Sequence, residues 1–471
     1  MQPITAKDVV DACKGELVAG DMDTRITSVS TDTRTIAPGS LFVALTGENS
    51  DGHKFLADAL SKGAVGVVVS HKVEAQCLAI RVPDTLLALG DLAAFYRSKF
   101  SPTVVGVTGS VGKTTTKEMI AAVAAAGGPV LKNEGNFNNE IGLPLTLLNL
   151  ASRHKTAVVE MAMRGAGQID YLARIAKPSI GVITNIHMSH IELLGSMDAI
   201  ADAKGELLDH LPKDGAAILN ADDAYFDYLS RRANCRVISF GESAHAAVRA
   251  VSSGIDSKGC CHFEVVIRSS EAGSEARSSG KSVAGRFDVH IPVPGEHNIK
   301  DALAAIAVGE ELGIAHDDIK SALAAFKAPE KRSNVIPSRR GFVVIDDTYN
   351  ASPASVKSAL KTLSMMEGDR KIAVLGDMLE LGEHAVEVHL EIGRTVQESG
   401  IDALVAVGEL AKLIARGAID AGMPISAVSE FEDSAQAANE VPSKVREQDV
   451  VLVKGSRAMK MERIVEGLNA A

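Results

Sequence analysis

The sequence has no excess of basic residues, few cysteines and no long apolar run. Lysine and arginine total 49 against 60 aspartates and glutamates, a formal net charge of -11, so non-specific binding to nucleic acid is disfavoured. The five cysteines form no CxxC pair and no zinc-type spacing, and their odd number is typical of free thiols in a reducing compartment. With no signal-peptide pattern and no apolar stretch near the ~20 residues of a membrane span, the sequence predicts a cytoplasmic protein.

The length indicates several domains. At roughly 150 residues per domain, a chain of 471 residues is expected to hold about three. Its composition, 46% hydrophobic and 23% charged, is typical of folded globular proteins. We expect a monomer with a small N-terminal α/β domain at 1–83, a central domain at 84–328 and a C-terminal α/β domain at 329–471.

Predicted strands and helices alternate along most of the chain. In the first domain, apolar runs at 40–45 and 64–70 flank a helical stretch at 53–63. After a helix at 84–100, the central domain has predicted strands at 103–110, 156–162, 179–186 and 216–222 and helices at 114–126, 168–176 and 196–211. This alternation predicts an α/β fold in which helices cover both faces of a parallel sheet.

The remainder of the chain continues this pattern after one change. Residues 236–294 show the alternation of β-strands, interrupted by a Ser/Gly-rich stretch at 269–282 that predicts a mobile hairpin loop. A helix at 298–313 and a hinge at 328–341 follow. The third domain is expected to be Rossmann-like; its predicted strands and helices are 341–347, 355–363, 370–377, 389–400, 403–408 and 449–456.

A glycine-rich loop, TGSVGKTTT at 108–116, joins a predicted strand to a predicted helix. Glycines allow backbone N–H groups to converge on an anion, and the helix N-terminus adds positive potential. Lys113 is expected to reach the β- and γ-phosphates of ATP, and Thr114 to bind Mg²⁺. Val107 replaces the first glycine of the strict GxxxxGK[ST] pattern, so Gly109 makes the turn. The expected ATP contacts in this loop are Gly109, Ser110, Gly112, Lys113, Thr114 and Thr115.

Polar residues follow the next two strands. Glu160 ends one strand, and His187 and His190 follow the other. Because the carboxyl ends of parallel strands meet at one edge, we expect these side chains to face the loop. A carboxylate there suits Mg²⁺, whereas a histidine is unusual beside ATP, where oxygen ligands dominate. Lys204, on the next helix, would by composition alone be a surface lysine. These residues leave a kinase, a switch, a motor and a ligase open.

Ten segments together resemble the Mur ligase family of peptidoglycan synthesis. They are TGSVGKTTT, GNFNNEIGLP, VVEMAMRGAGQI, TNIHMSHIELLGS, AKGELL, LNADD, PGEHNIKDALAA, DDTYNASPASV, LGDMLELG and VLVKGSR. With STDTR near the N-terminus, the likeness covers nearly the whole chain. The later segments are most similar to the branch that joins D-alanyl-D-alanine to UDP-N-acetylmuramoyl-tripeptide. The resemblance implies an ATP-dependent carboxylate-amine ligase that forms UDP-N-acetylmuramoyl-pentapeptide, ADP and phosphate through an acyl phosphate.

The resemblance also implies two Mg²⁺ ions. Thr114 and Glu160 would bind one ion, and His190 together with a carbamylated Lys204 would bind the second. A lysine amine that captures CO2 becomes an anionic oxygen ligand, which explains a lysine at a metal site. His187 is the neighbouring alternative to His190. The catalytic residues implied are Lys113, Glu160, His190 and Lys204.

For the nucleotide, the resemblance implies contacts from both larger domains. Asn138 and Asn298 match the amides on the adenine side, Asp347 matches the ribose-binding carboxylate, and Arg332 matches an arginine near the phosphates. Asp301 departs from the family, since many members carry a second asparagine there. An aspartate can accept a hydrogen bond from the adenine amino group but cannot donate one when ionised.

For the other substrates, the resemblance implies sites in the outer domains. Thr33 and the turn Glu48-Asn49-Ser50 match the region near uridine or the diphosphate. The residues expected to line the dipeptide site are Asn350, Lys454, Ser456 and Arg457.

Three alternatives stay open. The DNPR motif typical of the diamino-acid-adding branch, MurE, is absent, and the UDP-type first domain argues against folylpolyglutamate synthetase. A P-loop phosphotransferase that forms no amide would leave the matches at Lys204 and His190 unexplained. Whether the tripeptide ends in lysine or diaminopimelate also stays open.

Overall fold

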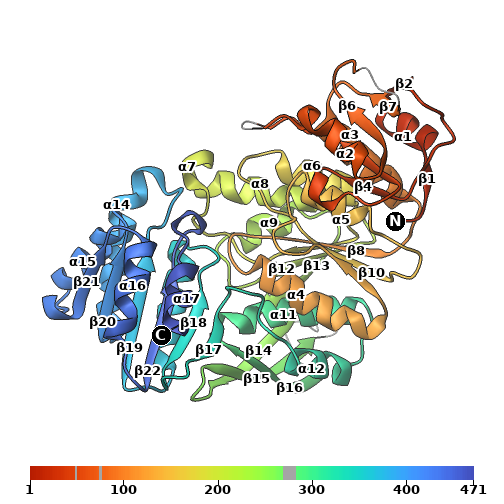
Figure 1. Ribbon diagram of the computed structural model, residues 1–471. Coiled ribbons are helices and arrows are strands. Elements are labelled where there is room, and N and C mark those ends of the chain that lie inside the picture. The colour runs from red at the N-terminus through yellow and green to blue at the C-terminus, as the bar shows by residue number, and fades with distance from the viewer. Residues whose placement is uncertain (48–49, 74–76, 269–282, 471) are drawn as a thin grey trace.

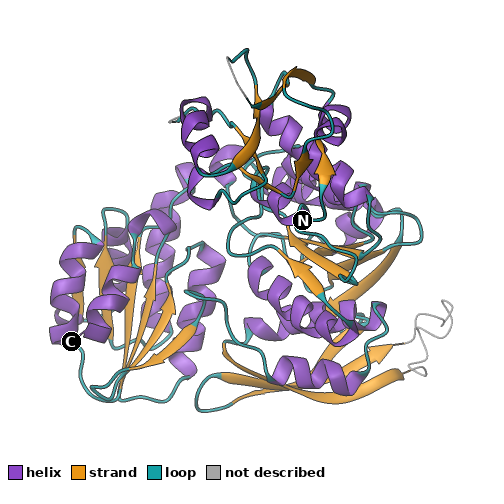
Figure 2. Cartoon of the chain, turned by 45° about the vertical axis from the view of Figure 1, so that its right-hand side comes forward, coloured by secondary structure: helices purple, strands orange, loops and turns teal. Residues whose placement is uncertain are grey.

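The computed structural model describes residues 1–47, 50–73, 77–268 and 283–470, so the predicted hairpin loop at 269–282 lies outside the described residues. Figure 1 shows three α/β bodies, with the second between the other two, the N-terminus on the first and the C-terminus on the third. Figure 2 shows helices on both sides of the strands in the second and third bodies. The expected α/β class is therefore confirmed.

The first body is built on a small mixed sheet. Its strand order is β2 (Glu16–Ala19), β7 (Leu78–Arg81), β6 (Ala64–Val69), β5 (Ser40–Val43) and β4 (Ser28–Ser30). All neighbours are parallel except β2 with β7. The short strands β1 (Ile4–Thr5) and β3 (Arg25–Ile26) pair beside it, and the helices are α1 (Ala6–Cys13) and α2 (Leu56–Ser61). The apolar runs predicted as strands form β5 and β6.

Helix α3 (Thr85–Ser98) joins the first body to the second. Its N-terminus is capped by Asp84, whose carboxylate accepts the backbone N–H groups of Leu86 and Leu87. Tyr96 on this helix is fully buried; its hydroxyl donates to the Leu150 carbonyl oxygen at 2.9 Å and accepts from the Gln2 backbone N–H. One continuous apolar core therefore extends across both bodies through this helix.

The second body has a nine-stranded sheet in the order β16-β15-β14-β13-β12-β11-β8-β10-β9. Its parallel strands are β8 (Thr103–Thr108), β9 (Val130–Lys132), β10 (Thr156–Glu160), β11 (Ile180–Ile183), β12 (Ala216–Asn220) and β13 (Arg236–Gly241). Strand β14 (Val248–Ile255) pairs parallel to β13 and antiparallel to β15 (Cys260–Arg268), which pairs antiparallel to β16 (Val283–Pro294). The alternating β segment at 236–294 thus extends the parallel sheet instead of forming a sheet of its own.

Both faces of the sheet are buried along the parallel strands β8, β10, β11 and β12, as their near-continuous apolar sequences require. Val104 faces the core formed with α3, α6 (Gln168–Ala176) and α8 (Met197–Asp209), whereas Val105 faces the opposite core formed with α4 (Lys113–Ala124) and α11 (His297–Glu311). The shorter helices of this body are α5 (Gly142–Leu147), α7 (Ile191–Leu194), α9 (Phe226–Arg232) and α12 (His316–Ala324).

The third body has a six-stranded sheet, parallel except for its first edge strand. The order is β17 (Asn334–Pro337), β18 (Val343–Asp347), β22 (Asp449–Lys454), β19 (Arg370–Gly376), β20 (Ala403–Val407) and β21 (Val428–Phe431). Helices α13 (Pro353–Met365), α14 (Ala385–Glu398) and α15 (Ala411–Asp420) cover one face, and α16 (Ser434–Lys444) and α17 (Glu462–Ala470) cover the other. This is the Rossmann-like arrangement that the sequence predicts.

Within the described residues, every helix is too short or too polar to cross a membrane.

Helices α14 and α15 approach each other closely because each carries a glycine at the contact. A Cβ atom on Gly393 would lie 2.1 Å from the Ile414 carbonyl oxygen, and one on Gly417 would lie 2.2 Å from the Leu390 carbonyl oxygen. Both obstacles are backbone atoms, so a side chain cannot be fitted by a rotamer change.

We therefore expect Gly393→Ala to destabilise the third body by about 1–3 kcal/mol, the usual cost of overpacking a tight contact. Thermal unfolding followed by far-UV circular dichroism measures this. Gly165→Ala is the matched control, because a Cβ atom there meets nothing within 4 Å. Equal unfolding midpoints for both variants would contradict the close helix contact.

Candidate active site

A large cavity, about 1720 Å³, lies between the second and third bodies. It is lined by residues that follow β8, β10 and β11 on one side and β18 and β22 on the other. In both parallel sheets these are the carboxyl ends of the strands, where α/β proteins bind ligands. The first body contributes no described residue to the lining.

The glycine-rich loop forms one wall of this cavity. Gly109 and Gly112 have φ angles of 144° and 85°, which favour glycine. Contacts also exclude side chains, since a Cβ atom on Gly109 would lie 2.0 Å from Thr184 Oγ1. Gly112 precedes the first turn of α4, so the loop and the helix N-terminus form an anion-binding shape.

Lys113 lies within this loop. Its Nζ donates to the carbonyl oxygens of Gly109 at 2.7 Å and Ser110 at 3.2 Å. Burial lowers the pKa of Lys113, an effect that the Glu160 carboxylate opposes. The ammonium group is thus held at the loop where a phosphate would compete with the two carbonyl oxygens.

Thr114 and Glu160 are in direct contact. Thr114 Oγ1 donates to Glu160 Oε2 at 2.8 Å, and the Glu160 side chain is buried at the end of β10. Asn138 Nδ2 donates to the other carboxylate oxygen at 2.8 Å. Asn138 therefore lies beside the phosphate loop, and the hydroxyl and carboxylate together offer the oxygen donors that Mg²⁺ prefers.

Lys204 and His190 lie close to Lys113. Lys204 on α8 is 2% exposed, and its ammonium group has no carboxylate partner among the described residues. Burial, together with the charge of Lys113, holds the pKa of Lys204 well below its ordinary value. His190 has a left-handed backbone, with φ 56°. Burial lowers the pKa of its ring, and the charges of both lysines lower it further.

Glu380 is a site residue that the sequence analysis did not single out. Its Oε2 lies 2.5 Å from His190 Nδ1, and its Oε1 accepts a hydrogen bond from Arg164 at 3.3 Å. Both partners belong to the second body, whereas Glu380 belongs to the third. It lies within the LGDMLELG segment, so the signal was present in the sequence, but only the fold shows the contact.

The remaining nucleotide-side residues line the same cavity. Asn298 is buried, and its Nδ2 donates to the Pro294 and Gly295 carbonyl oxygens at 2.8 and 3.1 Å. Arg332 stacks on the Tyr349 ring, 4.0 Å from the centroid, between two residues with positive φ. Asp347 accepts a hydrogen bond from Lys454 Nζ at 2.5 Å.

The residues predicted for the dipeptide also gather at this cavity. Lys454 Nζ donates to the Asn350 carbonyl oxygen at 2.9 Å, and Ser456 Oγ accepts from the Leu379 N–H at 2.9 Å. Arg457 pairs with Glu462, 2.9 Å away.

The residues predicted for uridine are not part of this cavity. Thr33 and Ser50 belong to the first body and lie outside the lining. Glu48 and Asn49 lie outside the described residues.

Comparisons with known proteins agree across the chain. Three family descriptions match: "Mur ligase family, catalytic domain" at 25–97, "Mur ligase middle domain" at 107–309 and "Mur ligase, glutamate ligase domain" at 331–457. The UDP-N-acetylmuramoyl-tripeptide--D-alanyl-D-alanine ligase of Bacillus subtilis is 38% identical, with 98% of each chain covered.

Solved structures of MurF enzymes also match nearly the whole chain. A crystal structure of MurF from Acinetobacter baumannii has a TM-score of 0.89 at 31% identity, covering 100% of both chains. MurF from Thermotoga maritima in complex with ADP has a TM-score of 0.80 at 28% identity, covering 94% of this chain and 97% of that one.

Asp301 makes the site sensitive to pH. Thr116 Oγ1 donates to its Oδ1 at 2.8 Å, but its buried Oδ2 has no partner. Burial raises the pKa of Asp301 from 3.8 to about 7, against the opposing effects of Thr116 and Arg332. The folded chain thus binds this proton more tightly than the unfolded chain does, and stability falls as pH rises from about 4 to about 7.

We expect Asp301→Asn to remove this slope in the nucleotide-free protein. At about 1.4 kcal/mol per pKa unit, the free energy of unfolding of the unsubstituted chain should fall by up to about 4 kcal/mol between low and neutral pH. The variant should not show this fall. Urea unfolding at several pH values, followed by circular dichroism, measures the difference. Asp317→Asn, whose side chain is 96% exposed, is the control. Parallel pH profiles for Asp301→Asn and the unsubstituted chain would refute the assignment.

Proposed function

This chain belongs to the Mur ligase family, and we propose that it joins D-alanyl-D-alanine to UDP-N-acetylmuramoyl-tripeptide at the expense of ATP. The observation that carries this proposal is the full-length similarity to ligases of that name, combined with a phosphate loop that opens onto a cavity shared with the third body. The missing DNPR motif favours this acceptor over the diamino acid of the MurE branch.

In this proposal, each of the three bodies binds a different substrate. Residues 1–83 bind the UDP end, with Thr33, Asn49 and Ser50 as contacts; 84–328 bind ATP; and 329–471 bind the dipeptide. Asn350, Lys454, Ser456 and Arg457 are proposed to line the dipeptide site. Their support is a common location at the cavity, opposite the phosphate loop.

The first chemical step is phosphoryl transfer from ATP to the tripeptide carboxylate. A carboxylate is a poor electrophile, and phosphorylation supplies a leaving group for the later attack by the dipeptide amine. Phosphoryl transfer requires mainly positioning and charge neutralisation. The loop N–H groups and Lys113 would hold the β- and γ-phosphates in place of the carbonyl contacts that Lys113 makes here.

The residues present fit a Mg²⁺ ion at the loop. Thr114 and Glu160 would hold it, since their oxygens are 2.8 Å apart and Asn138 orients the carboxylate. When bound, Mg²⁺ neutralises negative charge on the phosphates. We therefore propose that Asn138 positions the Glu160 carboxylate for the ion. Asn298, Arg332 and Asp347 are proposed to contact the nucleoside and phosphates.

A second Mg²⁺ is proposed at His190 and a carbamylated Lys204. Unmodified Lys204 is unsuited to a cation site, but its lowered pKa favours the neutral amine, and that amine attacks CO2. The new N–C bond and the release of one proton convert it into an anionic oxygen donor. Among the described residues, burial and the charge of Lys113 lower the pKa of Lys204 and no carboxylate opposes them, which supports this proposal.

The ligase reaction itself is testable directly. With ATP, Mg²⁺ and UDP-N-acetylmuramoyl-tripeptide, phosphate release is expected only when D-alanyl-D-alanine is added, and mass spectrometry should show the UDP-pentapeptide. Lys113→Ala is expected to lower the rate by about 100- to 1000-fold. Release with no dipeptide would indicate a plain phosphotransferase, and release only with a diamino acid acceptor would indicate the MurE reaction.

The carbamate has its own test. We expect Lys204→Ala to lower the ligase rate by about 10- to 100-fold, and an added short carboxylic acid to restore part of it by filling the vacated space with an anion. Lys213→Ala, an exposed lysine shortly after the same helix, should behave like the unsubstituted chain. Full activity of Lys204→Ala without added carboxylate would disprove the role.

A further inference from the structure

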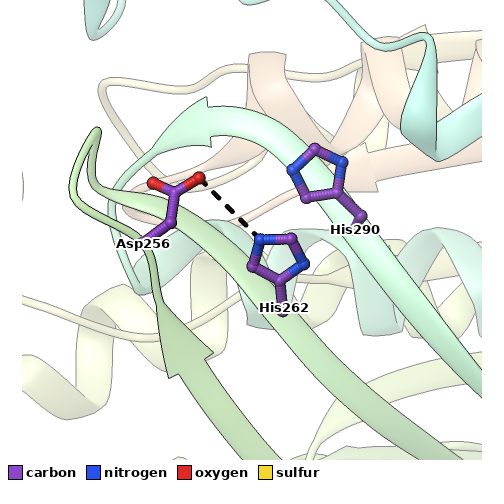
Figure 3. Close-up of side chains that lie close together, drawn as sticks. All are labelled: Asp256, His262 and His290. Atoms are coloured by element: carbon purple, nitrogen blue, oxygen red, sulfur yellow. Dashed lines mark ion pairs between the residues drawn. The ribbon is translucent and has the colours of Figure 1, made fainter.

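A second group of potential ligands lies on the edge of the nine-stranded sheet, away from the large cavity. Asp256, His262 and His290 each offer one donor atom, and these atoms all lie within 4.8 Å of one another (Figure 3). His262 and His290 line a shallow hollow of about 480 Å³, which shares no lining residue with the large cavity. The proposed ligase reaction does not use them.

The sheet register brings the two histidines together. His262 on β15 and His290 on β16 are direct cross-strand partners, and their rings stack with centroids 4.3 Å apart. Their neighbours Cys261 and Ile291 point into the buried core. Because side chains alternate along a strand, both histidines face outward from a rigid backbone.

Asp256 is oriented toward this pair by the turn between β14 and β15. Its Oδ1 accepts the backbone N–H groups of Lys258 and Cys260, both at 2.9 Å. Its Oδ2 is left facing His262, with 3.8 Å between Oδ2 and Nε2. A ligand whose second oxygen is fixed by hydrogen bonds is a common feature of metal sites.

The next cross-strand pair adds negative charge. Glu264 and Asp288 are direct partners on the same outward face, an arrangement that is unfavourable for two carboxylates. Arg286 pairs with Glu264 at 2.6 Å. The Asp288 carboxylate therefore contributes to a local potential that favours a cation beside the histidines.

We propose that Asp256, His262 and His290 bind a divalent first-row transition-metal cation, with Zn²⁺ as the representative ion. Two imidazoles and one carboxylate suit such an ion, whereas Mg²⁺ and Ca²⁺ prefer oxygen ligands. Zinc lies about 2.0–2.2 Å from such donors, so the three side chains rotate toward one another on binding. The remaining coordination positions are open to water.

Hydrogen bonds connect the turn at this site to elements that form the proposed active site. In the turn that carries Asp256, the Ser257 carbonyl oxygen accepts from the Glu367 N–H of the third body at 3.1 Å, and the Gly259 carbonyl oxygen accepts from the Gly295 N–H at 3.0 Å. Gly295 lies two residues before the start of α11, the helix that carries Asn298 into the large cavity. An ion on Asp256 would stiffen a turn that supports both bodies.

Zinc titration of the full-length protein against a chromophoric chelator tests the site. The His262→Gln/His290→Gln variant should lose one high-affinity equivalent, and Asp256→Asn, which keeps an acceptor for the turn, should bind it about 10- to 100-fold more weakly. Excess Mg²⁺ should not displace this equivalent. His245→Gln and His71→Gln are matched controls, because His245 is exposed elsewhere and His71 stacks on His53 in the first body.

Two further readouts make the result specific. A crystal soaked in zinc should show anomalous scattering between the three side chains, and hydrogen exchange in the turn at 256–259 should slow when zinc is added. Thermal unfolding in the presence of chelator checks that the variants are folded. An unchanged zinc stoichiometry in the folded double variant, or anomalous density only at the large cavity, would overturn the proposal.

Discussion

The parallel direction of the strands is the constraint on which the rest of the site depends. Each parallel sheet delivers the residues after its strands to one edge, and here the two edges face each other across one cavity. The phosphate loop after β8 and Asp347 at the end of β18 are far apart in the chain, yet both line this cavity. The second and third bodies therefore both contribute residues to the lining of the cavity between them.

Several ionisable side chains with little access to water lie at the cavity between the second and third bodies. Lys204 and Asp301 are buried and Lys113 is half-buried at or beside the cavity, and the loss of surrounding water disfavours the charged form of each. Such groups reduce the stability of a folded chain unless something pairs with them. Their concentration around the phosphate loop is consistent with a site whose charge balance is completed by bound phosphates, metal ions or a carbamate. Ionisable groups with shifted pKa values are common at functional sites, although they lower the stability of the folded chain.

Much of the fold and part of the site could be predicted from the sequence, because the relevant signals are local. The phosphate loop, the apolar strands and the family segments are each readable within a few residues, and the α/β class and the family were confirmed. The pairing of His190 with Glu380 and of Thr116 with Asp301 could not be predicted, since each joins residues more than 180 positions apart. The continuation of the parallel sheet into β14–β16 and the cluster at Asp256 depend on strand register, which alternation alone does not define.

The contact between Glu380 and His190 has a consequence for the imidazole itself. A carboxylate accepts hydrogen bonds, so a ring nitrogen 2.5 Å from Glu380 carries a proton, and that nitrogen is Nδ1. The lone pair of the neutral ring then resides on Nε2. Because Glu380 belongs to the third body and His190 to the second, the relative position of the two bodies selects the tautomer. A change in the position of the third body relative to the second would therefore also change how well this histidine can act as a ligand.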